Sequence, residues 1–209
     1  MAQADVILRN ARPDEAAAIA RVEVTGWPAE LAADRAQIDC RLRVYPEGQW
    51  VAALEGRVVA VAWSQRIGQA FLDATPHRFD ALTDGGTFAD SHDPQGDIFQ
   101  LIGVAVAPAE RGSRLGRKLV DREIAFARGL PGVKRILGFT RPAGYHRHGQ
   151  LTIQQYAAFH HESGRPIDPM LAFHLQAGAR LVSLTAQFRP EDRQACGYGA
   201  LIEYPMRAS

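Results

Sequence analysis

Residues 101–120 hold a group of side chains and glycines suited to binding an anion. An apolar, strand-like run ends at Pro108 and passes through a short basic loop into a helix with apolar residues on one side. A strand that feeds a helix through such a loop directs several backbone N–H groups, and the positive end of the helix dipole, at one point. The segment therefore predicts a cradle for a diphosphate. Its predicted members are Arg111, Gly112, Ser113, Arg114, Leu115, Gly116 and Arg117.

The basic side chains of this loop strengthen the prediction, because an arginine fork can grip a phosphate with two hydrogen bonds. A plainer interpretation stays open, in which the loop is a basic turn that begins a surface helix. Two better-known phosphate sites are excluded. The chain contains neither G-x-x-x-x-G-K-[ST] nor G-x-G-x-x-G, so it has no nucleotide P-loop and no Rossmann fingerprint.

Other chemistries find less support in the sequence. Its histidines include the pairs His146/His148 and His160/His161, but no carboxylate or cysteine accompanies them at the spacing of known zinc sites. No metal site is therefore predicted. No serine stands in a G-x-S-x-G elbow and neither cysteine has a histidine nearby in the sequence, which argues against a covalent hydrolase.

Composition narrows the class of protein. The chain has 209 residues, 46% of them hydrophobic, and no low-complexity linker divides it, so one domain over 1–209 is expected. A formal net charge of +1 argues against a nucleic-acid partner. There is no signal-peptide pattern, and no apolar run approaches the roughly 20 residues that span a bilayer. With Cys40 and Cys196 expected as free thiols, we predict a soluble, cytoplasmic protein without a membrane partner.

The elements that must position these residues follow from hydrophobic periodicity and turn residues, which predict a mixed α/β domain in the order β-α-α-β-β-β-α-β-α-β-β. Strands are expected at 6–10, 50–54, 58–64, 98–106, 134–141, 180–184 and 198–204. Helices are expected at 14–24, 28–43, 116–128, 152–161 and 169–177. Asp14 and Asp168 are the expected N-caps of the first and last helices. Residues 67–96 are expected to form a loop or short helix near the mouth of the site.

This order of elements, with Val104-Ala-Val-Ala-Pro108 before Arg111-Gly-Ser-Arg-Leu-Gly116, resembles the GNAT superfamily of acyl-CoA-dependent acyltransferases. The usual cradle there reads Gln/Arg-x-x-Gly-x-Gly/Ala, and this chain has Arg114 where the first glycine normally stands. The resemblance implies a GNAT fold of the α/β class: a mixed, mostly antiparallel central sheet with a splayed strand pair, flanked by helices. It also implies a coenzyme A thioester as substrate, and no metal.

The resemblance further implies how the thioester is held. In that superfamily pantetheine enters the gap beside the splayed strand, which here implies contacts with the backbone of Val104 and Val106. A tyrosine four residues before a glycine often protonates the leaving thiolate, and His174 stands in that place before Gly178. A histidine exchanges a proton near neutral pH more readily than a tyrosine of pKa ~10 does. A half-buried histidine bonded to a backbone carbonyl is the open alternative.

A finer resemblance rests on Thr140 at a strand end, on Trp27 after the first helix and on the tail from residue 187 to 204. Together these look like the GNAT-like decarboxylases in loading modules of polyketide synthases, although a similar tail occurs in GNAT domains fused to carbon–nitrogen hydrolases. The resemblance implies that Thr140 and His174 act on malonyl or methylmalonyl thioesters, that Trp27 walls the pocket and that Arg189 holds a carboxylate or phosphopantetheine. A surface ion pair is the alternative for Arg189.

Three functions follow from these interpretations. The first is decarboxylation of a malonyl-type thioester in polyketide starter formation, with acyl-CoA and the phosphopantetheine arm of an acyl carrier protein as partners. The second is a conventional N-acetyltransferase, whose amine-deprotonating base would be Glu23, Asp97 or Glu203. The third is a non-catalytic CoA-binding or interaction domain.

Overall fold

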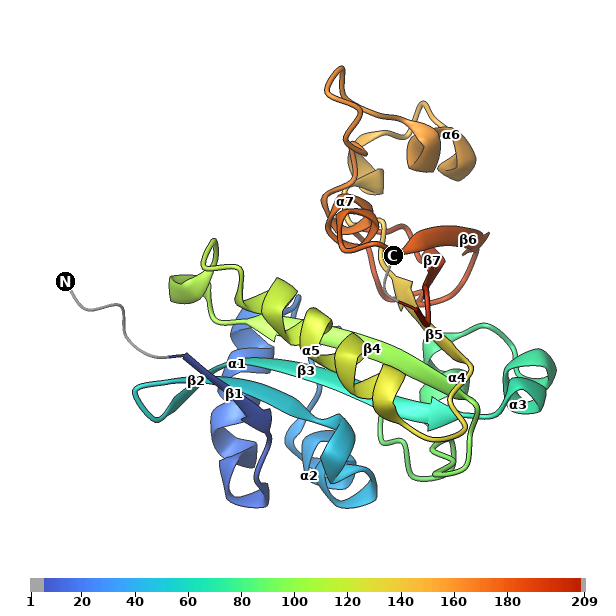
Figure 1. Cartoon of the computed structure of the whole chain (residues 1–209). Helices are drawn as coiled ribbons and strands as arrows, with labels where there is room; N and C mark the ends of the chain where they lie inside the picture. The colour runs from blue at the N-terminus through green and yellow to red at the C-terminus, as the bar shows by residue number, and fades with distance from the viewer. Residues whose placement is uncertain (1–5, 208–209) are drawn as a thin grey trace.

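The computed structural model describes residues 6–207 and contains a mixed seven-stranded sheet in the order β1-β2-β3-β4-β5-β7-β6 (Figure 1). The strands are β1 (Val6–Asn10), β2 (Trp50–Leu54), β3 (Arg57–Ile67), β4 (Ile98–Val106), β5 (Arg135–Thr140), β6 (Arg180–Thr185) and β7 (Gly199–Tyr204). Every neighbouring pair is antiparallel except β4 and β5, which run parallel. The predicted α/β class and the mostly antiparallel sheet are confirmed.

Helices cover both faces of the sheet. They are α1 (Ala16–Gly26), α2 (Arg35–Val44), α3 (Gln69–Ala74), α4 (Phe79–Thr83), α5 (Leu115–Gly129), α6 (Ile153–Ala158) and α7 (Pro169–Gln176). Figure 1 shows α5 on one face of β2–β4 and α1 with α2 on the opposite face. The longest of them, α5, buries Leu119, Val120, Ile124 and Ala127 against the strands. Within residues 6–207, no helix combines the length and the apolar character that crossing a membrane requires.

Three of the predicted helices differ from the structure by two or more residues at one end or both. Asp14 lies in a 3-10 turn and does not cap the first helix. The second helix begins at Arg35 instead of 28, because the Asp34 carboxylate accepts a hydrogen bond from Gln37 N at 2.8 Å and caps it there. Helix α6 ends at Ala158, three residues before the predicted end. The segment 67–96, expected to be a loop or short helix, contains both α3 and α4.

Strands β4 and β5 diverge, as the family resemblance implies. Their pairing runs from Ile98↔Arg135 only to Leu101↔Gly138, although β4 continues to Val106. On its other side, β4 changes register against β3 between Leu101 and Gly103, which leaves Ile102 as an extra residue. Such a bulge bends the strand and increases its twist. The two strands therefore separate at their carboxyl ends.

The position of α7 depends on Asp168, which is fully buried. Its Oδ1 accepts hydrogen bonds from the N–H groups of Met170 and Leu171, both at 2.9 Å, so the predicted N-cap is confirmed. Its Oδ2 accepts from Gly144 N at 3.0 Å and from the Tyr156 hydroxyl at 2.9 Å. One carboxylate thus joins α7, α6 and the segment that follows β5.

Candidate active site

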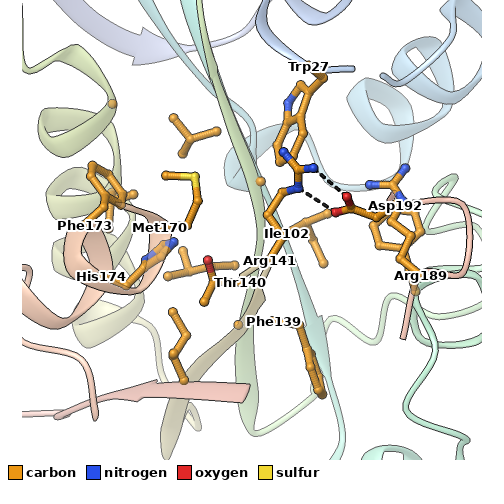
Figure 2. A pocket seen from close by; sticks show the side chains of 18 of the residues that line it. Trp27, Ile102, Phe139, Thr140, Arg141, Met170, Phe173, His174, Arg189 and Asp192 are labelled. Carbon is orange, nitrogen blue, oxygen red and sulfur yellow. Dashed lines mark hydrogen bonds and ion pairs between the residues drawn. The ribbon is translucent and has the colours of Figure 1, made fainter. Parts of the chain in front are cut away.

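A cavity of about 360 Å³ opens where β4 and β5 diverge. Its walls come from the C-terminal end of α1, the outer half of β4, the end of β5, helices α5 and α7, and the segment between β6 and β7. Residues lining it include Trp27, Ile102, Gly103, Val104, Val106, Arg111, Gly116, Glu123, Thr140, Arg141, Met170, Phe173, His174, Arg189 and Asp192. Figure 2 shows the cavity from close by. Residues far apart in the sequence are thereby brought together.

His174 reaches the cavity from α7 (Figure 2). Its Nδ1 lies 2.6 Å from the Tyr204 hydroxyl of β7, so its partner is a side chain and not the backbone carbonyl of the alternative interpretation. Burial lowers the imidazole pKa to about 4. Burial therefore favours the neutral ring at neutral pH in the protein without ligand, and proton exchange by His174 stays a prediction. When Tyr204 donates to Nδ1, Nε2 carries the proton.

Thr140 ends β5 and is paired with Ala200 of β7. It is 6% exposed, and its side chain reaches the same cavity as the His174 ring (Figure 2). None of the side chains drawn there makes a hydrogen bond to its hydroxyl. The sheet thus presents a hydroxyl, and α7 an imidazole, to one enclosed space.

Trp27 follows the last residue of α1 and packs against the bulged part of β4. A Cβ built on Gly103 would lie 3.1 Å from Trp27 Cζ2, so only a glycine lets the indole approach the strand this closely. On its other side the ring lies 5.9 Å from the Arg141 guanidinium carbon. The indole therefore forms a wall of the cavity, where the sequence placed it.

Two arginines and one aspartate occupy the cavity end nearest α4 (Figure 2). Arg141 is bound by Asp192, with Nε–Oδ2 and Nη2–Oδ1 both 2.6 Å. Arg189 donates to the Leu31 carbonyl at 2.8 Å and to Glu191 at 3.0 Å. Arg189 therefore lines the cavity and also forms an ion pair with Glu191, which was the alternative interpretation. Neither Arg141 nor Asp192 was identified as a lining residue from the sequence. The one available signal was that Arg141 directly follows Thr140.

The predicted cradle lies at the N-terminus of α5. Gly112 and Arg114 have positive φ angles of 89° and 63°, and Arg114 is the N-cap. Arg114 thus adopts the left-handed conformation that a glycine takes more easily, at the position where the family motif has one. A Cβ built on Gly116 would lie 3.4 Å from Val104 Cγ1 and 3.5 Å from Val106 Cγ2. The helix therefore begins close against β4, and its first N–H groups have no partner within the helix.

The side chains of the predicted cradle have different hydrogen-bond partners within the protein. Arg111 points toward the end of α1, where its Nη2 donates to the Thr25 carbonyl at 3.3 Å. Arg117 pairs with Asp121 at 2.8 Å and donates to the Gln176 carbonyl of α7 at 3.0 Å. Ser113 bonds to the carbonyl of its own turn. Leu115 is buried and contributes only its backbone to the loop surface. Phosphate binding by these residues stays a prediction.

None of the three carboxylates weighed as amine bases lines the cavity. Glu23 accepts hydrogen bonds from Trp63 Nε1 at 2.6 Å and from Ala33 N at 3.1 Å. Asp97 accepts from Gln69 N at 2.9 Å. Glu203 of β7 pairs with Arg135 of β5 and Arg180 of β6, the two neighbouring strands. Each therefore holds the fold together instead of facing a substrate.

The cavity carries one carboxyl that sequence reasoning did not find. Glu123 of α5 is 1% exposed, lines the cavity, and its Oε1 has no hydrogen-bond partner among the described residues. Burial raises its pKa well above the ordinary value of a glutamate. A glutamate on the buried face of a helix, between Val120 and Ala127, was the available signal. Within residues 6–207, no group of three or more histidine, cysteine or acidic residues is arranged to hold a metal ion.

Comparison with known proteins agrees with this architecture. The model of a family described as "Acetyltransferase (GNAT) family" matches residues 15–149. Among curated proteins, the "Uncharacterized N-acetyltransferase YkwB" of Bacillus subtilis (strain 168) is 27% identical over 181 residues, which span 85% of this chain and 77% of that protein.

Two solved structures superpose on nearly the whole of this chain. The loading GNATL domain of CurA from Lyngbya majuscula superposes with a TM-score of 0.87 at 25% identity, over 97% of this chain and 98% of that one. The GphF GNAT-like decarboxylase, solved in complex with isobutyryl-CoA, gives a TM-score of 0.82 at 33% identity, over 96% of this chain and 100% of that one. These likenesses confirm the family and the finer resemblance found in the sequence.

Proposed function

The chain belongs to the acetyltransferase (GNAT) family, and we propose that it binds a malonyl- or methylmalonyl-type thioester and releases carbon dioxide from it. The observation that carries this proposal is that Thr140 and His174 line the same cavity. The likeness to the GphF decarboxylase supports the same reaction. The likeness to the CurA loading domain supports a role in polyketide starter formation, with transfer of the acyl group to the phosphopantetheine arm of an acyl carrier protein.

The acyl-CoA is proposed to enter along the diverging strands. Its diphosphate is held by the N–H groups of residues 112–116 at the start of α5, where the helix dipole favours negative charge. Its pantetheine arm runs beside Val104 and Val106, along the edge of β4 that β5 no longer pairs with. The acyl group then lies between Trp27, Thr140 and His174.

Decarboxylation breaks the bond between the α-carbon and the carboxylate carbon, and the electron pair enters the thioester as an enolate. Donors aimed at the thioester oxygen stabilise this charge and lower the barrier. Thr140 and His174 Nε2–H are the proposed donors. Because a neighbouring anion favours the protonated imidazole, the enolate raises the His174 pKa. His174 can then take a proton from solvent and deliver it to the α-carbon, which completes the shortened acyl thioester.

Arg189 is the proposed partner of the substrate carboxylate or of the phosphopantetheine arm. Its Nε and Nη2 are bonded to Glu191 and to the Leu31 carbonyl, and the guanidinium lies 4.0 Å over the Phe79 ring. These contacts hold the guanidinium in place and leave Nη1 for a ligand. The apolar walls beside it would strip water from the carboxylate before it leaves.

A conventional N-acetyltransferase is the second candidate, supported by the name of the YkwB relative. That reaction needs a base to deprotonate an ammonium group. Of the two carboxyls that line the cavity, Asp192 is bound by Arg141, and the burial that raises the pKa of Glu123 disfavours the carboxylate form that a base needs. The cavity therefore favours decarboxylation over acetyl transfer. If neither reaction occurs, the third candidate, a non-catalytic CoA-binding domain, applies.

The test is incubation of the purified protein with malonyl-CoA, methylmalonyl-CoA and acetyl-CoA, with the thioesters followed by mass spectrometry. We expect loss of carbon dioxide from a malonyl compound, and no such loss with a Thr140→Val, His174→Gln double variant. Consumption of acetyl-CoA only when an amine is added would support the second candidate. Binding without turnover of any thioester would leave a CoA-binding domain.

A further inference from the structure

We propose that Glu123 is a ligand-contacting residue, whose carboxyl donates a hydrogen bond to an amide carbonyl of the pantetheine arm inside the cavity. The inference rests on the proposed binding of an acyl-CoA. It adds a contact from α5 to the backbone contacts that the family resemblance implies for β4.

The helical spacing places Glu123 on the face of α5 that lines the cavity. Gly116, Val120 and Glu123 lie at positions i, i+4 and i+7 of α5, and all three line the cavity. With a rise of 1.5 Å per residue, Glu123 lies about 10 Å further along the helix than Gly116. Gly116 belongs to the cradle, so Glu123 lies where an arm that leaves the diphosphate runs inward.

Glu123 has no other partner that explains its burial. Its Oε1 is buried and makes no hydrogen bond to any described residue, and no arginine or lysine of the described chain pairs with it. The nearby Arg117 is bound to Asp121 and to the Gln176 carbonyl. A buried polar group left unpaired is costly, so such groups usually serve a ligand or a water.

The protonation state of Glu123 decides which group it can bind. Around it stand Tyr204 of β7, Tyr45 before β2 and His174 of α7, with Arg66 of β3 beyond Tyr45. His174 is neutral, and burial raises the pKa of Tyr45 to about 12. Burial raises the pKa of Glu123, and no cation of residues 6–207 pairs with it to oppose that shift, so the protonated carboxyl is favoured. A protonated carboxyl has one O–H donor, which suits a neutral carbonyl acceptor better than an anion-binding role.

The experiment measures binding of coenzyme A by isothermal titration calorimetry. Glu123→Met keeps the length of the side chain and removes the donor, and we expect its affinity for coenzyme A to fall at least tenfold. Glu123→Gln keeps a neutral donor and is expected to bind within about threefold of wild type. Both variants should bind 3′-phospho-ADP as wild type does, because this ligand has the diphosphate and lacks the pantetheine arm.

A second readout is the pH dependence of the same titration. The affinity of wild type for coenzyme A should fall as the pH rises through the raised pKa of Glu123, because a carboxylate cannot donate. Glu123→Gln should lack this fall, and this comparison stands even if Glu123→Met does not fold. Equal affinity and equal pH dependence in wild type and Glu123→Gln, with Glu123→Met unchanged, would overturn the inference alone. Failure of wild type itself to bind coenzyme A would instead overturn the proposed function.

Discussion

Arg141 and Asp192 meet side-on, with two hydrogen bonds of 2.6 Å, although 51 residues separate them in the sequence. The pair joins the residue after Thr140 to the segment that precedes β7. Asp192 also accepts from Ala195 N at 3.0 Å. The end of β5 that carries Thr140 is therefore fixed to the loop that carries Arg189.

Asp192→Ala should destabilise the protein. It leaves the Arg141 guanidinium buried without its counter-charge, and the expected loss is about 3–5 kcal/mol in the free energy of unfolding. Urea denaturation followed by circular dichroism measures it. Arg141→Met combined with Asp192→Leu removes both charges and should recover most of the loss. Equal stability of wild type and Asp192→Ala would show that the pair contributes little.

Thr140→Val should lower kcat for decarboxylation about 100-fold, with little change in KM. Valine keeps the shape of threonine but lacks the donor proposed to act on the enolate oxygen. Steady-state kinetics with malonyl-CoA measure the two constants separately. Thr185→Val on β6, away from the cavity, is the matched control. A change confined to KM would assign Thr140 to substrate binding alone.

The His174 imidazole should make stability depend on pH. Its pKa is about 4 in the folded protein and about 6.5 when unfolded. As the pH falls, the unfolded chain takes up the proton first, so this contribution is complete above pH 6.5 and is lost between about 6.5 and 4. By pH 5 the loss is about 2 kcal/mol.

Unfolding free energies at pH 7.5 and pH 5 test this for wild type and His174→Gln. The variant should lose about 2 kcal/mol less than wild type over this interval. His161→Gln changes an exposed residue and should behave as wild type does. An identical loss in all three proteins would contradict the buried, neutral state of His174.

Gly116→Val should weaken coenzyme A binding at least tenfold. A Cβ there is already in contact with Val104 and Val106, so the valine methyl groups would push the start of α5 away from β4 and displace the cradle. Calorimetry measures the dissociation constant. Gly129→Ala, at the other end of α5, is the control, since its Cβ would meet nothing within 4 Å. Unchanged affinity in Gly116→Val would place the ligand elsewhere.

Arg114→Gly should raise stability by about 1 kcal/mol, because the left-handed conformation strains a residue with a Cβ. Thermal unfolding measures the change. The same variant separates two parts of the cradle: it keeps the backbone N–H and loses the guanidinium. Retained affinity for 3′-phospho-ADP would show that the backbone alone holds the diphosphate, whereas a loss would assign a contact to the Arg114 side chain.

Much of the fold could be predicted because its signals are local. The predicted bounds of β1, β2 and β4 match the structure, since runs of apolar residues there end at turn residues. His174 was found by its distance from Gly178 within one helix. The predicted start of the second helix, at residue 28, lies seven residues before its start in the structure, Arg35. Residues 28–34 are compatible with a helix in the sequence, but the N-cap is Asp34.

The parts of the site that the sequence did not predict depend on contacts between segments that are distant in the chain. Nothing local marks Arg141 as the partner of Asp192, because the pairing exists only after β5 and β7 are adjacent. The His174 partner, Tyr204, lies 30 residues away for the same reason. Glu123 stands on the apolar face of α5 in the sequence, but its place in the cavity is defined only once α5 packs on the sheet. Burial, and with it the direction of each pKa shift, emerges only from the packed structure.

The hydrogen bond from Arg117 to the Gln176 carbonyl has a mechanical consequence. It ties the helix that starts at the cradle to the end of the helix that carries His174, two residues away. We therefore expect a movement of the first turn of α5, where a nucleotide would be anchored, to be transmitted to the C-terminal end of α7, close to the imidazole.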